Sequence, residues 1–74
     1  MIRIYGDFNN MDEQDRLLLH CIGSMADIEK HKAQLHEGLR VKLYSGDLDF
    51  EVEGLLIFDI VWRAEIDWST LLYL

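Results

Sequence analysis

Three stretches in the second half of the chain alternate residue by residue between apolar and polar side chains. They cover residues 39–44, 48–53 and 62–68. Such alternation is typical of strands with one buried and one solvated face. The connections at residues 45–47 and 59–61 are short, and short connections join antiparallel neighbours. The sequence therefore predicts an antiparallel meander of three strands.

Gly54 interrupts the second of these strands. The residues that follow it, 55–58, are apolar at every position. A bulge at Gly54 would bend the strand and carry its far end into the core. We therefore expect one long strand with a bend at this glycine.

The first half of the chain predicts two more strands. Ile2 and Ile4 alternate with polar neighbours, which indicates a strand over residues 1–5. Residues 6–14 are polar and predict a loop. Residues 16–22 are apolar on both faces apart from His20, which favours a central strand.

One helix is predicted over residues 24–37. Ser24 is a suitable N-cap, and Asp27 stands where the acid of a capping box belongs. Gly38 is suited to end the helix in the left-handed conformation. The apolar residues at helical spacing, which we expect on the buried face, are Met25, Ile28 and Leu35.

These elements define an α+β fold. It consists of about five antiparallel, strongly twisted strands, with one helix between strands two and three that covers the open face or end of the sheet. Strong twist and a bulge would also allow a small barrel of the SH3 or OB type. The sequence leaves the open sheet and the curled barrel as alternatives.

The chain is a single domain of 74 residues, so its core is thin. Small domains gain from a disulfide, a metal or self-association. Cys21 has no second cysteine to pair with, and His20, His31 and His36 are spread over different predicted elements, so no zinc site is expected. Self-association to a homodimer follows by elimination. We expect no cofactor, no signal peptide, no membrane span and a cytoplasmic location.

The net charge of −7 disfavours direct binding to nucleic acid. Four acids recur with period two along one predicted strand, and on one face they would repeat at a spacing near that of DNA phosphates. This suggests, as an alternative function, an acidic inhibitor from a phage or mobile element that mimics nucleic acid and binds a basic protein. We also expect Arg40 and Lys42 to pair with some of these acids across the hairpin. The candidate acidic face is Asp47, Asp49, Glu51 and Glu53, supported by Asp59, Glu65 and Asp67.

Catalytic and metal motifs are weak. Residues 7–13 match a calcium loop poorly, because Met11 occupies a ligand position and Asp12 replaces the glycine. They are better interpreted as an Asx-rich turn. His20 and Cys21 are neighbours on a predicted strand, so they point to opposite faces and form no nucleophile–base pair. We therefore expect a protein that is not an enzyme.

The C-terminal end is apolar and aromatic, whereas chain ends are usually polar. Residues 69–74 are interpreted as a short tail of one helical turn. This end either completes the core or forms an interface, where Trp and Tyr are enriched. We expect a non-catalytic interaction module that self-associates through this end. A third alternative is a small-ligand pocket in a barrel mouth, lined by Phe50, Phe58 or Trp62. The candidate interface residues are Trp62, Trp68, Leu71, Leu72, Tyr73 and Leu74.

Five short motifs are distributed over most of the chain: Tyr5-Gly6-Asp7-Phe8-Asn9-Asn10, Glu37-Gly38-Leu39, Val41-Lys42-Leu43-Tyr44, Val52-Glu53-Gly54 and Ile66-Asp67-Trp68. With these motifs the chain resembles a group of short, uncharacterised bacterial β-rich proteins. The resemblance implies a compact bacterial accessory protein and assigns no catalytic or binding residue. The sequence departs from the group's pattern between Phe58 and Trp62 and at the apolar C-terminal end.

Overall fold

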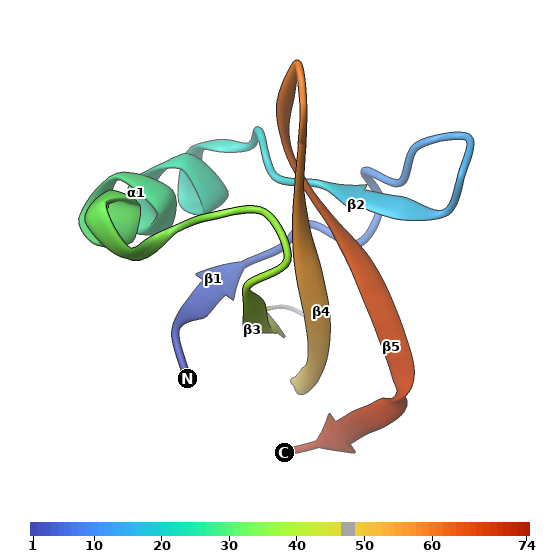
Figure 1. Ribbon diagram of the computed structural model, residues 1–74. Coiled ribbons are helices and arrows are strands. Elements are labelled where there is room, and N and C mark those ends of the chain that lie inside the picture. Colours follow the sequence, from blue (N-terminus) through green and yellow to red (C-terminus); the bar gives the residue numbers. More distant parts are fainter. Residues whose placement is uncertain (47–48) are drawn as a thin grey trace.

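The computed structural model describes residues 1–46 and 49–74. Within these residues it has five strands, one α-helix and a short 3₁₀ helix, so the fold is α+β as predicted (Figure 1). The elements in chain order are β1 (Arg3–Tyr5), β2 (Arg16–Leu18), α1 (Ile22–His31), the 3₁₀ helix η1 (Lys32–Gln34), β3 (Arg40–Ser45), β4 (Phe50–Asp59) and β5 (Val61–Tyr73).

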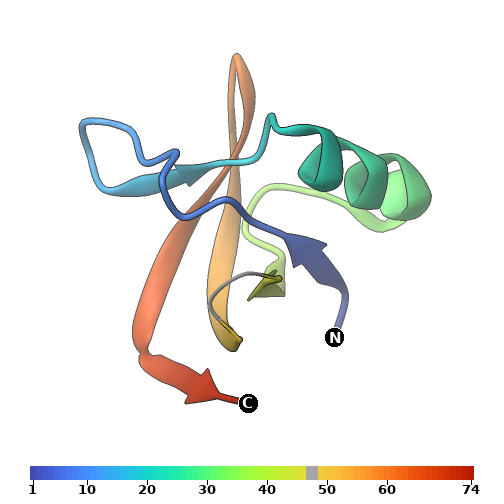
Figure 2. The same cartoon turned by 180° about the vertical axis from the view of Figure 1, so that it is seen from behind.

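The five strands form one sheet in the order β1-β3-β4-β5-β2. The predicted meander is confirmed, because β3, β4 and β5 are successive antiparallel neighbours. The all-antiparallel prediction is wrong, because β1 runs parallel to β3, with Ile4 opposite Leu43. A parallel pair needs a long crossover connection, and here β2 and α1 supply it. The sheet curls into a half-barrel (Figures 1 and 2).

β2 is a short edge strand and not the central strand that the sequence predicted. It pairs with β5 alone, with Leu17 opposite Ala64. Leu17 and Leu19 are nevertheless fully buried. The loop before β2 folds back along the other edge of this strand, through a bridge between Met11 and Leu17.

Helix α1 lies beside the β1 edge of the sheet (Figures 1 and 2). It begins two residues earlier than predicted and ends at His31, with η1 after it. The expected cap is absent: Cys21 occupies the N-cap position, without a side-chain cap bond. Ser24 is buried within the first turn, whereas Met25, expected on the buried face, is 55% exposed. Gly38 does adopt a positive φ, but in the turn before β3.

The predicted bulge at Gly54 is absent, since this residue pairs regularly with Val41 and with Ile66. The register shift lies nearby, between Glu51 and Glu53. Glycine is required at position 54 for another reason. A Cβ atom there would lie 2.9 Å from the backbone oxygen of Glu65 on β5.

The core lies on one face of the curled sheet. Its buried members come from every strand, and half-buried residues such as Phe8, Ile28 and Trp62 pack against them. No helix in the described part of the chain is long and apolar enough to cross a membrane. The buried apolar residues are Ile4, Leu17, Leu19, Val41, Leu43, Phe50, Val52, Leu56 and Ala64.

Candidate functional site

The C-terminal end of the chain is the second part of β5 and not a helical turn. Tyr73 lies opposite Phe50 and Leu72 opposite Glu51, and the Leu74 N–H donates to the Asp49 carbonyl at 2.9 Å. The register shift places residues 68–71 of β5 opposite a single residue of β4. The tail therefore completes the sheet, which the sequence left open.

The irregular segment of β5 is held by side-chain hydrogen bonds. The Thr70 hydroxyl accepts the Glu53 N–H at 2.7 Å and donates to the Asp67 carbonyl at 2.7 Å. Ser69 donates both its N–H and its hydroxyl to the Asp67 carboxylate. The hydroxyl bond from Ser69, followed by the guanidinium of Arg40, holds the pKa of Asp67 below its usual value. The bulged segment is therefore ordered.

The six candidate interface residues divide into two groups. Trp62 and Leu71 are half-buried and pack against the core. Trp68, Leu72, Tyr73 and Leu74 are 53%, 56%, 73% and 72% exposed. The first group supports folding, and the second remains available for contact.

Aromatic rings connect the exposed group to the core. The ring centroids of Phe8 and Phe50 are 4.8 Å apart, and Phe50 is buried. Trp68 lies 6.2 Å from Phe8, and Tyr73 lies 6.1 Å from Phe50. These separations are within the range of favourable ring contacts. The exposed faces of Trp68 and Tyr73 are thus held in fixed positions.

The predicted acidic face is different in the structure. Asp47 lies outside the described residues, and Asp49 lies in the turn before β4 with φ of 50°. Only Glu51 and Glu53 share a face of β4. The expected cross-strand pairing is confirmed: Arg40 contacts Glu53 at 2.6 Å and Lys42 contacts Glu51 at 3.7 Å.

Further ion pairs join acids and cations on this side. Arg3 contacts Glu51 at 2.7 Å, and Arg40 also contacts Asp67 at 2.5 Å. Glu65 is exposed opposite Arg16 on β2. This face of the sheet therefore alternates positive and negative charge, unlike a continuous acidic stripe.

Asp12 is the centre of the most enclosed charge cluster. Its carboxylate accepts from Arg16 Nε at 2.8 Å and Arg63 Nη1 at 2.9 Å, and from the N–H groups of Gln14 and Arg16. Burial would raise the pKa of Asp12, but these hydrogen bonds outweigh it and hold the pKa far below its usual value. Arg16 extends the cluster to Asp59 at 3.1 Å. The cluster fixes the loop to β2 and β5.

The loop before β2 forms Asx turns of the expected type. The Asp7 carboxylate accepts the Asn9 N–H at 3.1 Å, and Asp12 does the same for Gln14. Among the described residues, no cluster of three or more His, Cys, Asp or Glu is placed to hold a metal ion. His20 is exposed, and the Cys21 sulfur lies 3.2 Å from the Ser24 hydroxyl.

The aromatic residues of the proposed ligand pocket do not share one site. Phe50 belongs to the core, whereas Phe58 and Trp62 contact each other at the tip of the β4–β5 hairpin, with centroids 5.1 Å apart. This tip projects from the body of the protein in both views (Figures 1 and 2). Ile60, at the turn, is exposed and has a φ of 65°.

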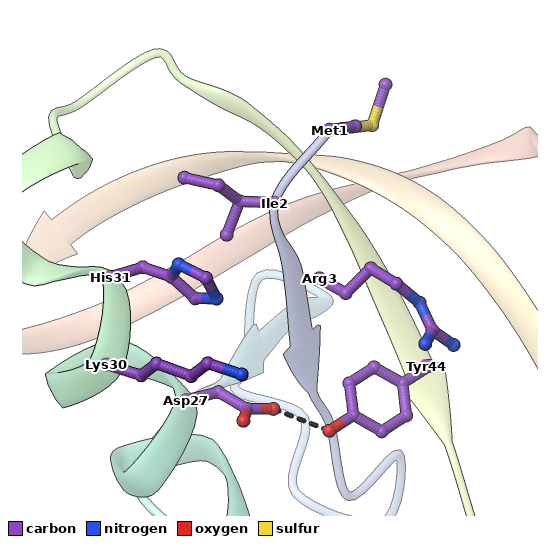
Figure 3. A pocket seen from close by; sticks show the side chains of 7 residues that line it. All are labelled: Met1, Ile2, Arg3, Asp27, Lys30, His31 and Tyr44. Atoms are coloured by element: carbon purple, nitrogen blue, oxygen red, sulfur yellow. Dashed lines mark hydrogen bonds between the residues drawn. The ribbon is translucent and has the colours of Figure 1, made fainter.

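A groove of about 500 Å³ lies instead between α1 and β1. Asp27 is its central polar group: its carboxylate accepts the Tyr5 N–H at 2.8 Å and the Tyr44 hydroxyl at 2.6 Å (Figure 3). The bond to Asp27, together with burial, raises the pKa of Tyr44 above its ordinary value. The lining residues are Met1, Ile2, Arg3, Asp27, Lys30, His31 and Tyr44.

The sequence did not predict this groove. Its residues come from β1, α1 and β3, and the parallel pairing that brings β1 beside β3 was not foreseen. Ser24 and Asp27 were the sequence feature from which the groove could have been predicted. Ser24 donates its hydroxyl to the Tyr5 carbonyl, so both residues bind the strand and neither caps the helix.

Comparison with protein-family models, with curated proteins and with solved structures gives no match for this chain. The functional argument therefore depends on the geometry alone.

Proposed function

We propose that this protein is a non-catalytic interaction module that forms a homodimer through the C-terminal part of β5. The observation that carries the proposal is an open strand edge with exposed apolar side chains. β5 pairs with β2 only over residues 63–65, so in the described part of the chain no strand covers its second edge beyond Glu65. Four large exposed apolar residues follow there, Trp68, Leu72, Tyr73 and Leu74.

Charge opposes contact with a second copy least at the C-terminal part of β5. The chain carries −7 overall, so two copies repel each other over most of their surfaces. Residues 68–74 contain no charged side chain. This segment is therefore where two copies approach with the least repulsion, and it offers no charge to a charged partner.

The other exposed apolar residues are less suited to a contact between copies. Phe58 and Ile60 flank Asp59 at the hairpin tip, where a second copy would bring a second carboxylate. Ile22 and Met25 lie on α1, and this helix already covers part of the β1 edge beside it. A twofold contact along β5 uses one surface for both partners, which is how most homodimers form.

Contacts of the candidate nucleophiles support a role without catalysis. The Cys21 sulfur is next to Ser24, whose hydroxyl already donates to a backbone carbonyl. The His36 ring is hydrogen-bonded to the carbonyl of the neighbouring Glu37. None of these three contacts joins a thiol or hydroxyl to a histidine ring, as a nucleophile and its base would be joined.

The test is the absolute mass in solution, measured by light scattering after gel filtration. We expect twice the chain mass of 8.7 kDa. The dimer should persist at roughly 1 M salt, where charges are screened beyond about 3 Å. Leu72→Glu, which puts a charge into the proposed contact, should give the monomer mass.

Ile22→Glu is the matched control, because Ile22 is 91% exposed on α1, outside the proposed contact. It should remain dimeric. A wild-type mass of one chain at every protein concentration, or equal dissociation of both variants, would exclude this proposal.

A further inference from the structure

The α1–β1 groove has an excess of positive charge in an acidic protein. Figure 3 shows Lys30 and His31 reaching in from the helix side, with Arg3 on the strand side. Lys30 is exposed and has no ion pair among the described residues. Lys32, two residues further along, forms an ion pair with Glu29 at 2.9 Å. Lys30 is therefore free to bind a ligand.

Arg3 has only part of its guanidinium in use. One nitrogen donates to Glu51 at 2.7 Å, and the group lies 4.5 Å from the centre of the Tyr44 ring. An arginine has five N–H donors, so others remain available. Stacking on Tyr44 restricts the side chain, which lowers the entropy that binding would cost.

Asp27 is the one acid among the described residues that line the groove, and its position is fixed by the fold. One of its oxygens accepts both the Tyr5 N–H and the Tyr44 hydroxyl. Hydrogen bonds of this kind disperse the negative charge of a carboxylate. Among the described lining residues, Arg3, Lys30 and the His31 ring supply N–H donors, against the one carboxylate of Asp27.

We propose that this groove binds a compact anion, the phosphate or carboxylate group of a small molecule. Lys30 and Arg3 would contact the anion from opposite sides of the groove, and the His31 ring would donate a hydrogen bond. The Tyr44 ring and Ile2 supply apolar surface for the rest of the ligand. This site is separate from the β5 contact and does not depend on dimerisation.

The experiment is an NMR titration of the ¹⁵N-labelled protein with sodium phosphate and, separately, with sodium acetate, at constant ionic strength kept by chloride. We expect saturable shifts centred on residues 1–3, 27–31 and 44. Saturation by both salts assigns the site to compact anions in general, and saturation by phosphate alone assigns it to phosphate groups. Shifts that increase linearly without saturation would overturn the proposal.

Lys30→Gln and Lys32→Gln are the matched variants. Both lysines are exposed and lie two residues apart, and of the two it is Lys30 that lines the groove. Lys30→Gln should weaken binding roughly fivefold, as expected for one exposed charge pair. Lys32→Gln should bind as the wild type does. Equal weakening by both would show general attraction to positive charge and would also overturn the proposal.

Discussion

Gly54 is the residue on which the close approach of β4 and β5 depends. A Cβ at this position would lie 2.9 Å from Glu65 O and 3.0 Å from Leu43 Cδ1. The first of these atoms is backbone and cannot move without shifting the strand. Gly54→Ala should therefore lower the free energy of unfolding by about 1–3 kcal/mol, as overpacking of a core does.

Urea unfolding followed by tryptophan fluorescence measures this change. Gly46→Ala is the control, because a Cβ there has its nearest neighbour at an ordinary 3.6 Å. It should change stability little. If both variants were equally stable, the close contact would not be the reason for glycine at position 54.

Ile60 is a second single residue of interest, because it shows why sequence patterns predict some turns poorly. It occupies the tip of the hairpin with φ of 65°, a conformation that β-branched residues rarely adopt. The turn lacks the Asn or Gly that normally signals such a hairpin. The long pairing of β4 with β5, from Phe50 to Asp59, imposes the turn. The alternation on both sides predicted where the turn lies. The strained backbone at Ile60 follows from the pairing of β4 with β5 along their whole length.

At the scale of elements, α1 is attached to the sheet mainly by polar bonds. Ser24 is the one helical residue that is fully buried, and with Asp27 it binds the outward-facing backbone of Tyr5. These two bonds cover part of the β1 edge, which would otherwise expose unpaired backbone groups. The helix therefore protects an edge strand as well as forming a wall of the groove.

Replacing Asp27 tests this attachment. Asp27→Ala leaves the Tyr5 N–H and the Tyr44 hydroxyl without their acceptor and should lower the free energy of unfolding by about 1–3 kcal/mol. Asp27→Asn keeps one acceptor oxygen and should retain most of the stability. It removes the negative charge, so the pKa of Tyr44 should fall back toward its ordinary value, measured by NMR titration.

Glu29→Ala is the control for Asp27, because Glu29 is exposed on the same helix and forms an ion pair with Lys32. It should change neither the stability nor the Tyr44 titration appreciably. An unchanged Tyr44 pKa in Asp27→Asn would show that burial, and not the bond to Asp27, raises it.

The sequence predicted the strands and the helix better than it predicted which of them lie side by side. Alternation gave β3, β4 and β5 and their order, because adjacent strands with short turns have little choice of partner. It could not give the parallel pairing of Ile4 with Leu43, which depends on contacts between distant segments. For the same reason Ser24 and Asp27 were interpreted as a cap. An apolar C-terminal end was visible in the sequence, but only the structure separates half-buried Leu71 from exposed Leu72.

At the scale of the whole molecule, the net charge of −7 is distributed unevenly. Many acids are neutralised in pairs across the sheet, such as Glu53 with Arg40 and Asp12 with Arg63. Lowering the pH therefore has two opposite effects. It reduces the general repulsion between acids, but it also removes the carboxylates that the folded state binds most strongly.

The second effect should dominate in strong acid. The folded-state pKa values of Asp12 and Asp67 are lower than those of an unfolded chain, where Asp titrates near 3.9. Groups of this kind stabilise the fold fully above about pH 4, and the contribution is lost as pH falls further toward the folded pKa. We expect the urea midpoint to fall steadily from pH 4 to pH 2 at constant ionic strength.

Asp12→Asn shows how much of the fall in the urea midpoint comes from the charge cluster around Asp12. Asn cannot pair with Arg16 and Arg63 as a carboxylate does, so the variant should be less stable than the wild type at pH 7. The gap between the two midpoints should shrink as pH drops below 4, because unfolding of the wild type then takes up a proton at Asp12 and unfolding of the variant does not. Asp15→Asn, at an exposed neighbouring acid, is the control and should follow the wild-type curve. A gap that stayed constant from pH 7 to pH 2 would mean that the carboxylate of Asp12 is not preferentially ionised in the folded state, and that the cluster acts through shape and hydrogen bonding alone.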